Sequence, residues 1–276
     1  MSALRAEFLA HATVAPPVRR GGWITPTIIG VATVIYLASF PLLDMSPLRI
    51  WSGLGQLFTI IGLMLPPSAG GHAALYLEAL GQTLSIALLG TLAAGILAFP
   101  LGFLAARNVV AGRVLHVLAR RSLDTVRSVD ALIWALIWIN VVGLGPFAGA
   151  LAIASADLGA LGKLMSEAIE TADRKPIEGV VASGGSKLLA IRFGIIPQVL
   201  PVFASQLLYF FESNTRSATI IGIVGAGGIG LHLFEAIRVL EWQQASFLIL
   251  IVLLTVAAID FVSQRLRAAI IGRRAS

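Results

Sequence analysis

A short polar segment, residues 211–219 (FESNTRSAT), lies within an otherwise apolar part of the sequence. Glu212 and Arg216 are four residues apart, so on a helix they stand one turn apart and can form an ion pair. Further hydrogen-bonding side chains beside them are Ser213, Asn214, Ser217 and Thr219. Because an ionisable pair is costly to bury among apolar groups, we interpret this segment as a candidate gate or path for a polar solute. The alternatives are a structural pair that locks this helix against a neighbour and a pair at an interface.

A second segment, Gly225 to Gly230 (GAGGIG), fits the pattern G-x-G-x-x-G. A dinucleotide site would need a preceding strand, a following helix and an acidic residue about twenty positions later. Here an apolar, helix-like segment precedes the glycines, and the first candidate acid, Glu241, comes too soon. We therefore predict a hinge or pathway-lining turn with close backbone approach, at Gly225, Gly227 and Gly228 in particular, with a simple external loop as the alternative.

The remaining chemistry-bearing residues are isolated. Gln82, Thr83, Ser85 and Asn140 are polar positions in apolar runs, and each is a lesser candidate for a solute path or for a helix-to-helix hydrogen bond. No cysteine is present, the histidines lack metal-ligand spacing, and no nucleophile stands beside a base. We expect neither an enzyme nor a metal site. The chain also lacks G-x-x-x-x-G-K-[ST], so an energy source such as ATP with Mg²⁺ would have to be bound by a partner.

The elements that must position these residues are membrane helices. The chain has 276 residues, of which 57% are hydrophobic and 12% charged, whereas a soluble domain is about a quarter charged. Apolar runs long enough to cross a hydrocarbon core of ~30 Å predict an all-α, polytopic membrane protein. We expect six spans: 23–43, 76–104, 129–145, 146–166, 194–214 and 243–264. Between the third and fourth, Gly143-Leu-Gly-Pro146 indicates a tight external turn or a kink.

The distribution of positive charge predicts the orientation. With the N-terminus inside the cell, 17 of the 20 lysines and arginines fall in cytoplasmic segments, and the exceptions are Arg49, Arg216 and Arg238. This asymmetry favours both termini in the cytoplasm. It also accounts for the net charge of +6 without a nucleic-acid surface, since no basic patch with interleaved aromatic residues is present.

Two predicted spans carry small residues at every fourth position. They are Gly90, Ala94, Ala98 and Gly102 in the second span and Ala148, Ala152, Ala156 and Ala160 in the fourth. Such stripes permit close approach of helices and predict a packed bundle, within one chain or across a dimer. The alternative is the ordinary enrichment of small residues in membrane helices.

The longest polar insertion, residues 166–201, carries a recognisable pattern. Glu178 is followed six residues later by Gly184, and twelve residues after that by Ile196-Pro197. This spacing resembles the EAA signature of the permease subunits of ABC importers, although Gly179 and Val180 replace the two usual alanines and Ile196 replaces the usual leucine. A short helix, a glycine-permitted turn and a second helix on the cytoplasmic face would form a knob that enters a groove on another protein. The alternative is an amphipathic loop on the lipid surface.

Further segments between residues 140 and 240, among them VGLGPFAGALA, KLMSEAIE, IIPQVLP and FESNTRSATIIGIVGAGGIG, resemble the permeases of phosphonate-type ABC importers. The resemblance implies the type I importer permease fold, with residues 1–75 as an N-terminal tail, first span and external segment, and residues 76–276 as the permease domain with a coupling loop near 173–193. It assigns the coupling role to Glu178, Gly179, Ser183, Gly184, Gly185 and Lys187.

The same resemblance implies the partners and the cargo. These are two copies of an ATP-hydrolysing subunit that binds ATP and Mg²⁺, an external binding protein for phosphonate or phosphate, a second copy of this chain, and the bacterial cytoplasmic (inner) membrane. The solute would be phosphonate or a related oxyanion, phosphate or phosphite, moved by alternating access. Two alternatives stay open: a permease of the same architecture for methionine or a quaternary amine, and a secondary transporter that needs no ATPase.

Overall fold

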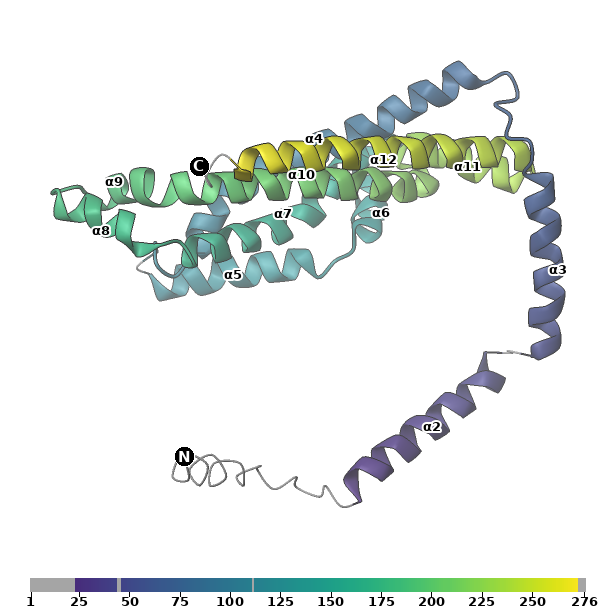
Figure 1. The fold of residues 1–276 in the computed structure, drawn as a ribbon, viewed down its shortest axis with the longest axis horizontal. Coiled ribbons are helices and arrows are strands. Elements are labelled where there is room, and N and C mark those ends of the chain that lie inside the picture. Colours follow the sequence, from purple (N-terminus) through teal and green to yellow (C-terminus); the bar gives the residue numbers. More distant parts are fainter. Residues whose placement is uncertain (1–22, 44–45, 111, 273–276) are drawn as a thin grey trace, which may run out of the picture. The chain divides into compact units, whose positions relative to one another are not determined.

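The computed structural model describes residues 23–43, 46–110 and 112–272 (Figure 1). Every regular element within these ranges is helical, which confirms the predicted all-α class. The chain divides into two compact units, residues 1–61 and 62–276, while the predicted boundary near residue 75 stays a prediction. The first unit contains α2 (Ile24–Leu42), which confirms the first predicted span, and most of α3 (Pro47–Leu63), a short apolar helix that the sequence reading missed.

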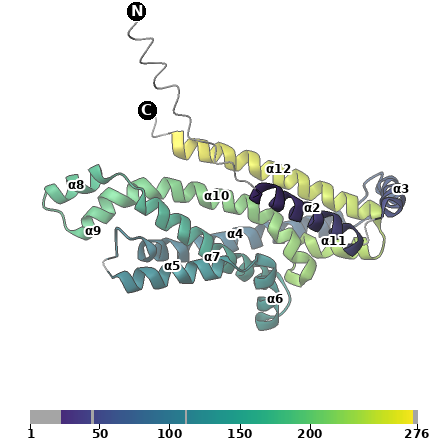
Figure 2. The ribbon, with the colours of Figure 1, turned by 90° about the horizontal axis from the view of Figure 1, so that it is seen from below.

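The second unit is a bundle of long helices with short ones at its ends. Its elements are α4 (Ala73–Ala105), α5 (Arg113–Arg127), α6 (Ala131–Val142), α7 (Pro146–Glu170), α8 (Arg174–Ala182), α9 (Lys187–Leu189), the π-helical η1 (Ala190–Ile195), α10 (Ile196–Ile221), the π-helical η2 (Gly222–Ala226), α11 (Ile229–Arg238) and α12 (Trp242–Gly272). Helix α10 lies between its neighbours and contacts α4, α7 and α12 (Figures 1 and 2).

The described residues contain five helices that are long and apolar enough to cross a membrane, or six if the bent pair α5 and α6 counts as one span. The predicted third span, 129–145, is therefore wrong as a single straight helix. Helix α6 has only 12 residues, about 18 Å at 1.5 Å per residue, which is too short to cross alone. It meets α5 at 89°, and the break falls where the Asp130 carboxylate caps α6 by accepting a hydrogen bond from Leu132 N at 2.8 Å.

The turn between α6 and α7 is built by glycines, as the sequence predicted. Gly143 and Gly145 have φ angles of 91° and 132°, and Pro146 begins α7. A proline at this position loses nothing, because the first amide of a helix has no partner within the helix. The segment is thus a turn between two separate helices and not a kink within one.

The predicted fifth span, 194–214, is too short. The helical segment runs from Lys187 through the π-helical η1 to Ile221, and the π-helical η2 follows it up to a kink at Gly225. From Lys187 to Ile221 it is about 50 Å long at 1.5 Å per residue, well beyond one hydrocarbon thickness. Hydropathy detected only the apolar middle of this helix. The π-helical turn η1 ends just before Pro197, where a proline ring would otherwise collide with the carbonyl group four residues earlier.

The small-residue stripes of α4 and α7 face each other within the chain. A Cβ atom on Gly90 would lie 2.7 Å from Ile153, and one on Gly102 would lie 2.5 Å from Met165. Ala94, Ala98 and Ala152 are fully buried. The predicted close approach is confirmed, and these stripes are used inside one bundle, so they give no support to a dimer.

Candidate functional site

The polar segment of α10 does not form one cluster. Glu212 and Asn214 are both buried, but two residues on a helix are about 200° apart, so their side chains leave opposite faces. Glu212 faces α12, and Asn214 faces α4 and α7. The sequence reading grouped these residues, and the structure separates them into an ion-pair cluster and a polar triad.

The ion-pair cluster is centred on the Glu212 carboxylate. Arg216 approaches one carboxylate oxygen at 3.4 Å, which confirms the predicted pairing, and Arg267 from α12 approaches the other oxygen, also at 3.4 Å. Arg267 also lies 3.9 Å from Asp260. The Glu212 side chain is 11% exposed, against 48% for Arg216, so Arg216 keeps half of its surface for another partner.

The sequence does not single out Arg267 as a site residue, because the distribution of positive charge predicts it in the cytoplasmic tail. It lies 25 residues after Trp242 on the unbroken helix α12, about 37 Å along its axis and beyond one hydrocarbon thickness. The cluster therefore lies towards the end of the span opposite Trp242. This position suits a bond that holds α10 to α12 and still leaves Arg216 accessible.

The polar triad joins three helices in the bundle interior. The Asn214 amide donates to Thr91 Oγ1 of α4 at 2.8 Å and to Asp157 Oδ2 of α7. Asp157 is 8% exposed and forms no ion pair with another described residue. The sequence reading missed Asp157, although a lone acid within the fourth predicted span was a usable signal.

The lesser candidates for the solute path differ in their exposure. Ser85 and Asn140 are exposed and donate to carbonyl groups of their own helices, Gly81 O at 2.9 Å and Leu136 O at 2.7 Å. Gln82 is also exposed, Ser213 and Ser217 are half-buried, and Thr219 is buried. Thr83 is buried, and its hydroxyl accepts a hydrogen bond from Ile229 N at 2.8 Å. Of the α4 candidates, Thr83 is the one tied to the glycine segment.

The glycine segment 225–230 ends the long helix and turns the chain into α11. Gly225, Gly227 and Gly228 have positive φ angles of 99°, 77° and 76°, and the Gly225 carbonyl accepts a hydrogen bond from Gly145 N at 3.0 Å. A Cβ atom on Gly230 would overlap the Thr219 carbonyl oxygen. The predicted close approach is confirmed, and since helices flank the segment, it lacks the strand that a dinucleotide site requires.

The insertion forms the helix, glycine turn and second helix that the sequence predicted. Helix α8 has no buried residue, and Gly184 makes the turn with a φ of 85°. Glu178, Gly179, Ser183, Gly184 and Lys187 are exposed, and Gly185 is half-buried. The base of α8 is held by Gly194 of η1, whose Cβ position lies 3.0 Å from the Ile177 backbone, and by Gln198 of α10, which accepts a hydrogen bond from the N-cap Asp173 N at 2.9 Å. The result is an exposed knob on a fixed base.

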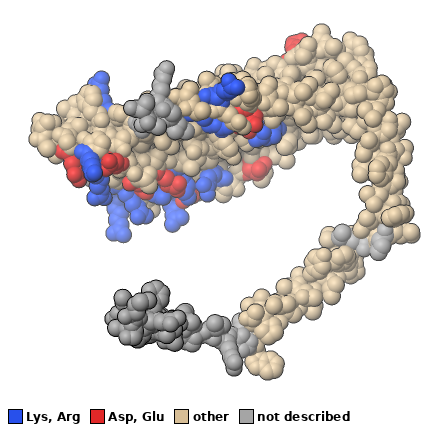
Figure 3. Space-filling view, in the orientation of Figure 1, with Lys and Arg blue, Asp and Glu red and all other residues tan. Residues whose placement is uncertain are grey.

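Lysines and arginines gather along α5 and α8 at the end of the bundle that carries this knob (Figure 3). Two ion pairs join α5 to α7 there: Lys163 to Asp124 at 2.9 Å and Arg120 to Glu170 at 3.0 Å. Among the described residues, no group of three or more His, Cys, Asp or Glu side chains could hold a metal ion.

Comparison with known proteins places this arrangement in context. Residues 98–275 match the family described as binding-protein-dependent transport system inner membrane component. The permease protein HtxC of Stutzerimonas stutzeri is 39% identical over 82% of this chain and 80% of its own length. The phosphite transport system permease protein PtxC of the same organism is 33% identical over 85% of each chain. The phosphate-import permease protein PhnE of Mycolicibacterium smegmatis is 35% identical over 88% of this chain, which spans 46% of that protein.

Solved structures of similar fold are also known. A chain of the inward-facing MetNI methionine ABC transporter matches with a TM-score of 0.65 and 17% identity, over 74% of this chain and 99% of that one. At this identity the likeness concerns the fold alone. It confirms the type I importer permease architecture predicted from the sequence.

Proposed function

This chain belongs to the family of binding-protein-dependent transport system inner membrane components, and on that premise we propose that it carries phosphonate, phosphite or phosphate across the membrane. The observation that carries the proposal is its likeness, over more than four fifths of the chain, to permeases named for phosphite and phosphate. The half-exposed Arg216 beside the buried Glu212 supports an oxyanion, because a guanidinium donates to the oxygens of such groups.

The exposed α8–α9 knob is the proposed docking surface for the ATP-hydrolysing partner. Its side chains Glu178, Ser183 and Lys187 are free to enter a groove, while the contact of Gly194 with Ile177 fixes the base of the knob. In the complete transporter, two such ATPases would bind ATP and Mg²⁺, a second copy of this chain would complete the pore, and an external binding protein would deliver the solute. The chain itself then performs no chemistry.

The helical segment from Lys187 to Ile221 provides the mechanical link. It joins the knob to Glu212 and Arg216 and leads to the kink at Gly225, and a helix transmits displacement along its axis. Motion of the ATPases at α8 and α9 would therefore shift the ion-pair cluster against α12 and open the bundle alternately to the two sides. In this scheme, Arg216, Ser213 and Ser217 line the path, and Gln82 and Asn140 lie along it.

We place both chain termini in the cytoplasm of a bacterium, with the protein in the inner membrane. The basic surface of α5 and α8 supports this orientation, because positive segments remain on the cytoplasmic side. The same end of the bundle carries the proposed docking surface for the ATPase, which is a cytoplasmic protein. The positive charge and the docking surface therefore support the same orientation.

The test is uptake of labelled methylphosphonate, phosphite and phosphate into proteoliposomes that contain this chain, its ATPase and its binding protein. Uptake should require ATP and the binding protein. Arg216→Gln should lower uptake by about tenfold or more, because the path loses a charged donor. The control Arg238→Gln, an exposed arginine on α11, should leave uptake unchanged.

A second pair of variants tests coupling. Glu178→Ala should leave basal ATP hydrolysis intact and abolish its stimulation by the binding protein, whereas Glu167→Ala, an exposed acid on α7, should behave as wild type. Uptake of methionine or a quaternary amine in place of the oxyanions would reject the substrate class and keep the permease. Uptake by this chain alone without ATP would identify a secondary transporter.

A further inference from the structure

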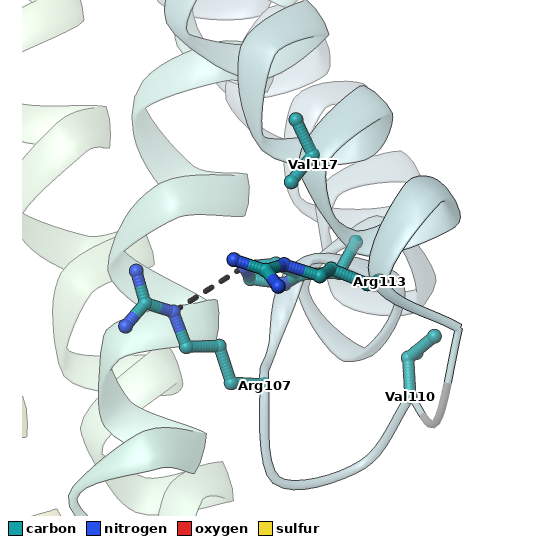
Figure 4. A pocket seen from close by; sticks show the side chains of 5 residues that line it. Arg107, Val110, Arg113 and Val117 are labelled. Atoms are coloured by element: carbon teal, nitrogen blue, oxygen red, sulfur yellow. Dashed lines mark hydrogen bonds between the residues drawn. The ribbon is translucent and has the colours of Figure 1, made fainter.

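A cavity of about 430 Å³ lies between the end of α4 and the start of α5, away from the ion-pair cluster and the polar triad. Its walls come from Arg107, Val110, Arg113, His116 and Val117 (Figure 4). None of the functions proposed above uses it. The two arginine side chains reach towards the same space from the loop after α4 and from the first turn of α5.

The lining is strongly cationic. It includes two guanidinium groups and an imidazole but no carboxylate. The nearby acid is Glu170, whose Oε1 atom already accepts hydrogen bonds from the Arg107 backbone N and from Arg120 Nη1, both at 3.0 Å. The Arg113 guanidinium makes no ion pair with any residue the structure describes. Positive charge therefore remains uncompensated at the cavity.

His116 adds a hydrogen-bond donor that lacks an acceptor. Its Nε2 atom accepts from Arg107 Nε at 3.4 Å, which places the imidazole proton on Nδ1. Nδ1 is buried and has no hydrogen-bond partner among the described residues, and His116 as a whole is 8% exposed. A buried donor without an acceptor costs free energy, so the arrangement fits a ligand that supplies one.

The start of helix α5 favours negative charge at the same place. The helix has 15 residues, and its N-cap is Gly112, which has no side chain to accept a hydrogen bond from the first amides. Unpartnered amides at a helix N-terminus carry partial positive charge and bind anions. Arg113 and His116 lie within this first turn, and both line the cavity together with Arg107, so the helix start, the two arginines and the histidine meet at one region.

We propose that this cavity is a binding site for a tetrahedral phosphorus oxyanion, held by Arg107, Arg113, His116 and the first turn of α5. Donors that converge from separate elements suit a group with several acceptor oxygens around one centre. Free inorganic phosphate and the phosphate group of an anionic lipid share this chemistry.

The position of the site connects it to the knob. Arg107 and Val110 also line a neighbouring cavity of about 280 Å³, whose other walls include Ile177 and Val181 of α8 and Lys187 of α9. An oxyanion bound to Arg107 would therefore be separated from the cavity beside α8 only by Arg107 and Val110, which line both cavities.

The test uses the purified full-length chain. Binding of radiolabelled inorganic phosphate is measured in detergent by equilibrium dialysis, and retention of phosphatidylglycerol is measured by native mass spectrometry. The variants are Arg113→Gln and His116→Phe. The matched control is Arg121→Gln, which removes a charge from the same helix at a side chain that is 80% exposed and outside the cavity. Circular dichroism and size-exclusion chromatography check that each variant folds.

We expect Arg113→Gln to weaken binding of one of the two ligands by about tenfold or more, His116→Phe to weaken it in the same direction, and Arg121→Gln to leave it unchanged. Loss of phosphate binding identifies free phosphate as the ligand, and loss of lipid retention alone identifies the lipid. The proposed site would be overturned if Arg113→Gln bound phosphate and phosphatidylglycerol as well as wild type does, or if Arg121→Gln lost as much binding as Arg113→Gln. It would also be overturned if phosphate binding were weakened only by Arg216→Gln. These results do not depend on transport, so the site and the proposed function can fail separately.

Discussion

Two glycine-containing segments of this chain look alike in sequence and differ in structure. In the knob, Gly179 and Gly184 have open space around them, with nothing within 4 Å of an added Cβ atom, whereas a Cβ atom on Gly185 would meet Val180 of the preceding helix. In the packed segment that ends α10 and begins α11, Gly222 and Gly230 approach each other so closely that a Cβ atom on either would meet backbone. Glycine permits a turn in the first segment and permits contact in the second.

The difference shows where each segment can change. The outer side chains of the knob can vary because they are exposed, while its base is held by the contact of Gly194 with Ile177 and by the hydrogen bond from Asp173 N to Gln198. The packed segment cannot vary, because it joins α4, α7, α10 and α11 through Thr83, Gly145 and Thr219. Substitutions in the packed segment should therefore disturb folding, and substitutions in the knob should disturb partner binding.

The largest effect is expected for Gly230→Ala. The added methyl group would overlap the Thr219 carbonyl oxygen, which belongs to a helix and cannot move alone. We expect a loss of about 3 kcal/mol or more in the free energy of unfolding, at the upper end for an overpacked core. Thermal unfolding of the detergent-solubilised protein measures it. A melting temperature equal to that of wild type would show that the packing of α10 on α11 is looser than described.

The next effect concerns the polar triad beside the packed segment. Asn214→Leu removes the donor to Asp157 and leaves a buried carboxyl group unsatisfied, at a cost of about 2 to 5 kcal/mol. Adding Asp157→Leu to the Asn214→Leu variant should recover much of the lost free energy of unfolding, because neither polar group then remains buried without its partner. Chemical denaturation of the two single variants and the double variant forms the cycle, and additive losses would contradict a direct interaction.

A smaller effect on the melting temperature should distinguish the two arginines that pair with Glu212. Arg267 is 21% exposed and Arg216 is 48% exposed, at the same distance from the carboxylate. Exposed pairs contribute about 0 to 1 kcal/mol, so Arg267→Gln should lower the melting temperature more than Arg216→Gln, whose main effect should be on uptake. The reverse order would mean that Arg216 holds the bundle and Arg267 lies on the path.

The smallest effects are expected in the knob. Gly184→Ala places a Cβ atom at a φ of 85° and should cost about 1 kcal/mol locally, whereas Gly179→Ala sits within α8 in open space and should cost nothing. Neither variant should lower the melting temperature of the bundle. ATP hydrolysis stimulated by the binding protein is then the sensitive measurement, and a melting temperature that falls as far as for Gly230→Ala would remove the distinction between the two segments.

The sequence by itself determined the helical class, most of the spans, the turn at Gly143 to Pro146 and the form of the knob. These features are local or compositional: apolar length requires helices in lipid, a positive φ favours glycine, and the ion pair of Glu212 with Arg216 follows from one helical turn. Local rules therefore sufficed for the turn, the knob and the ion pair within one helical turn.

Only the tertiary structure decided which residues meet across helices. It brought Arg267 to Glu212 over 55 positions and Asp157 to Asn214 over 57, and it showed that the small-residue stripes of α4 and α7 pair within one bundle. It also bent α5 away from α6 and placed Arg107 beside His116. Periodicity fixes the face of a helix, but the partner of that face depends on how the helices pack, because apolar stripes can fit more than one neighbour.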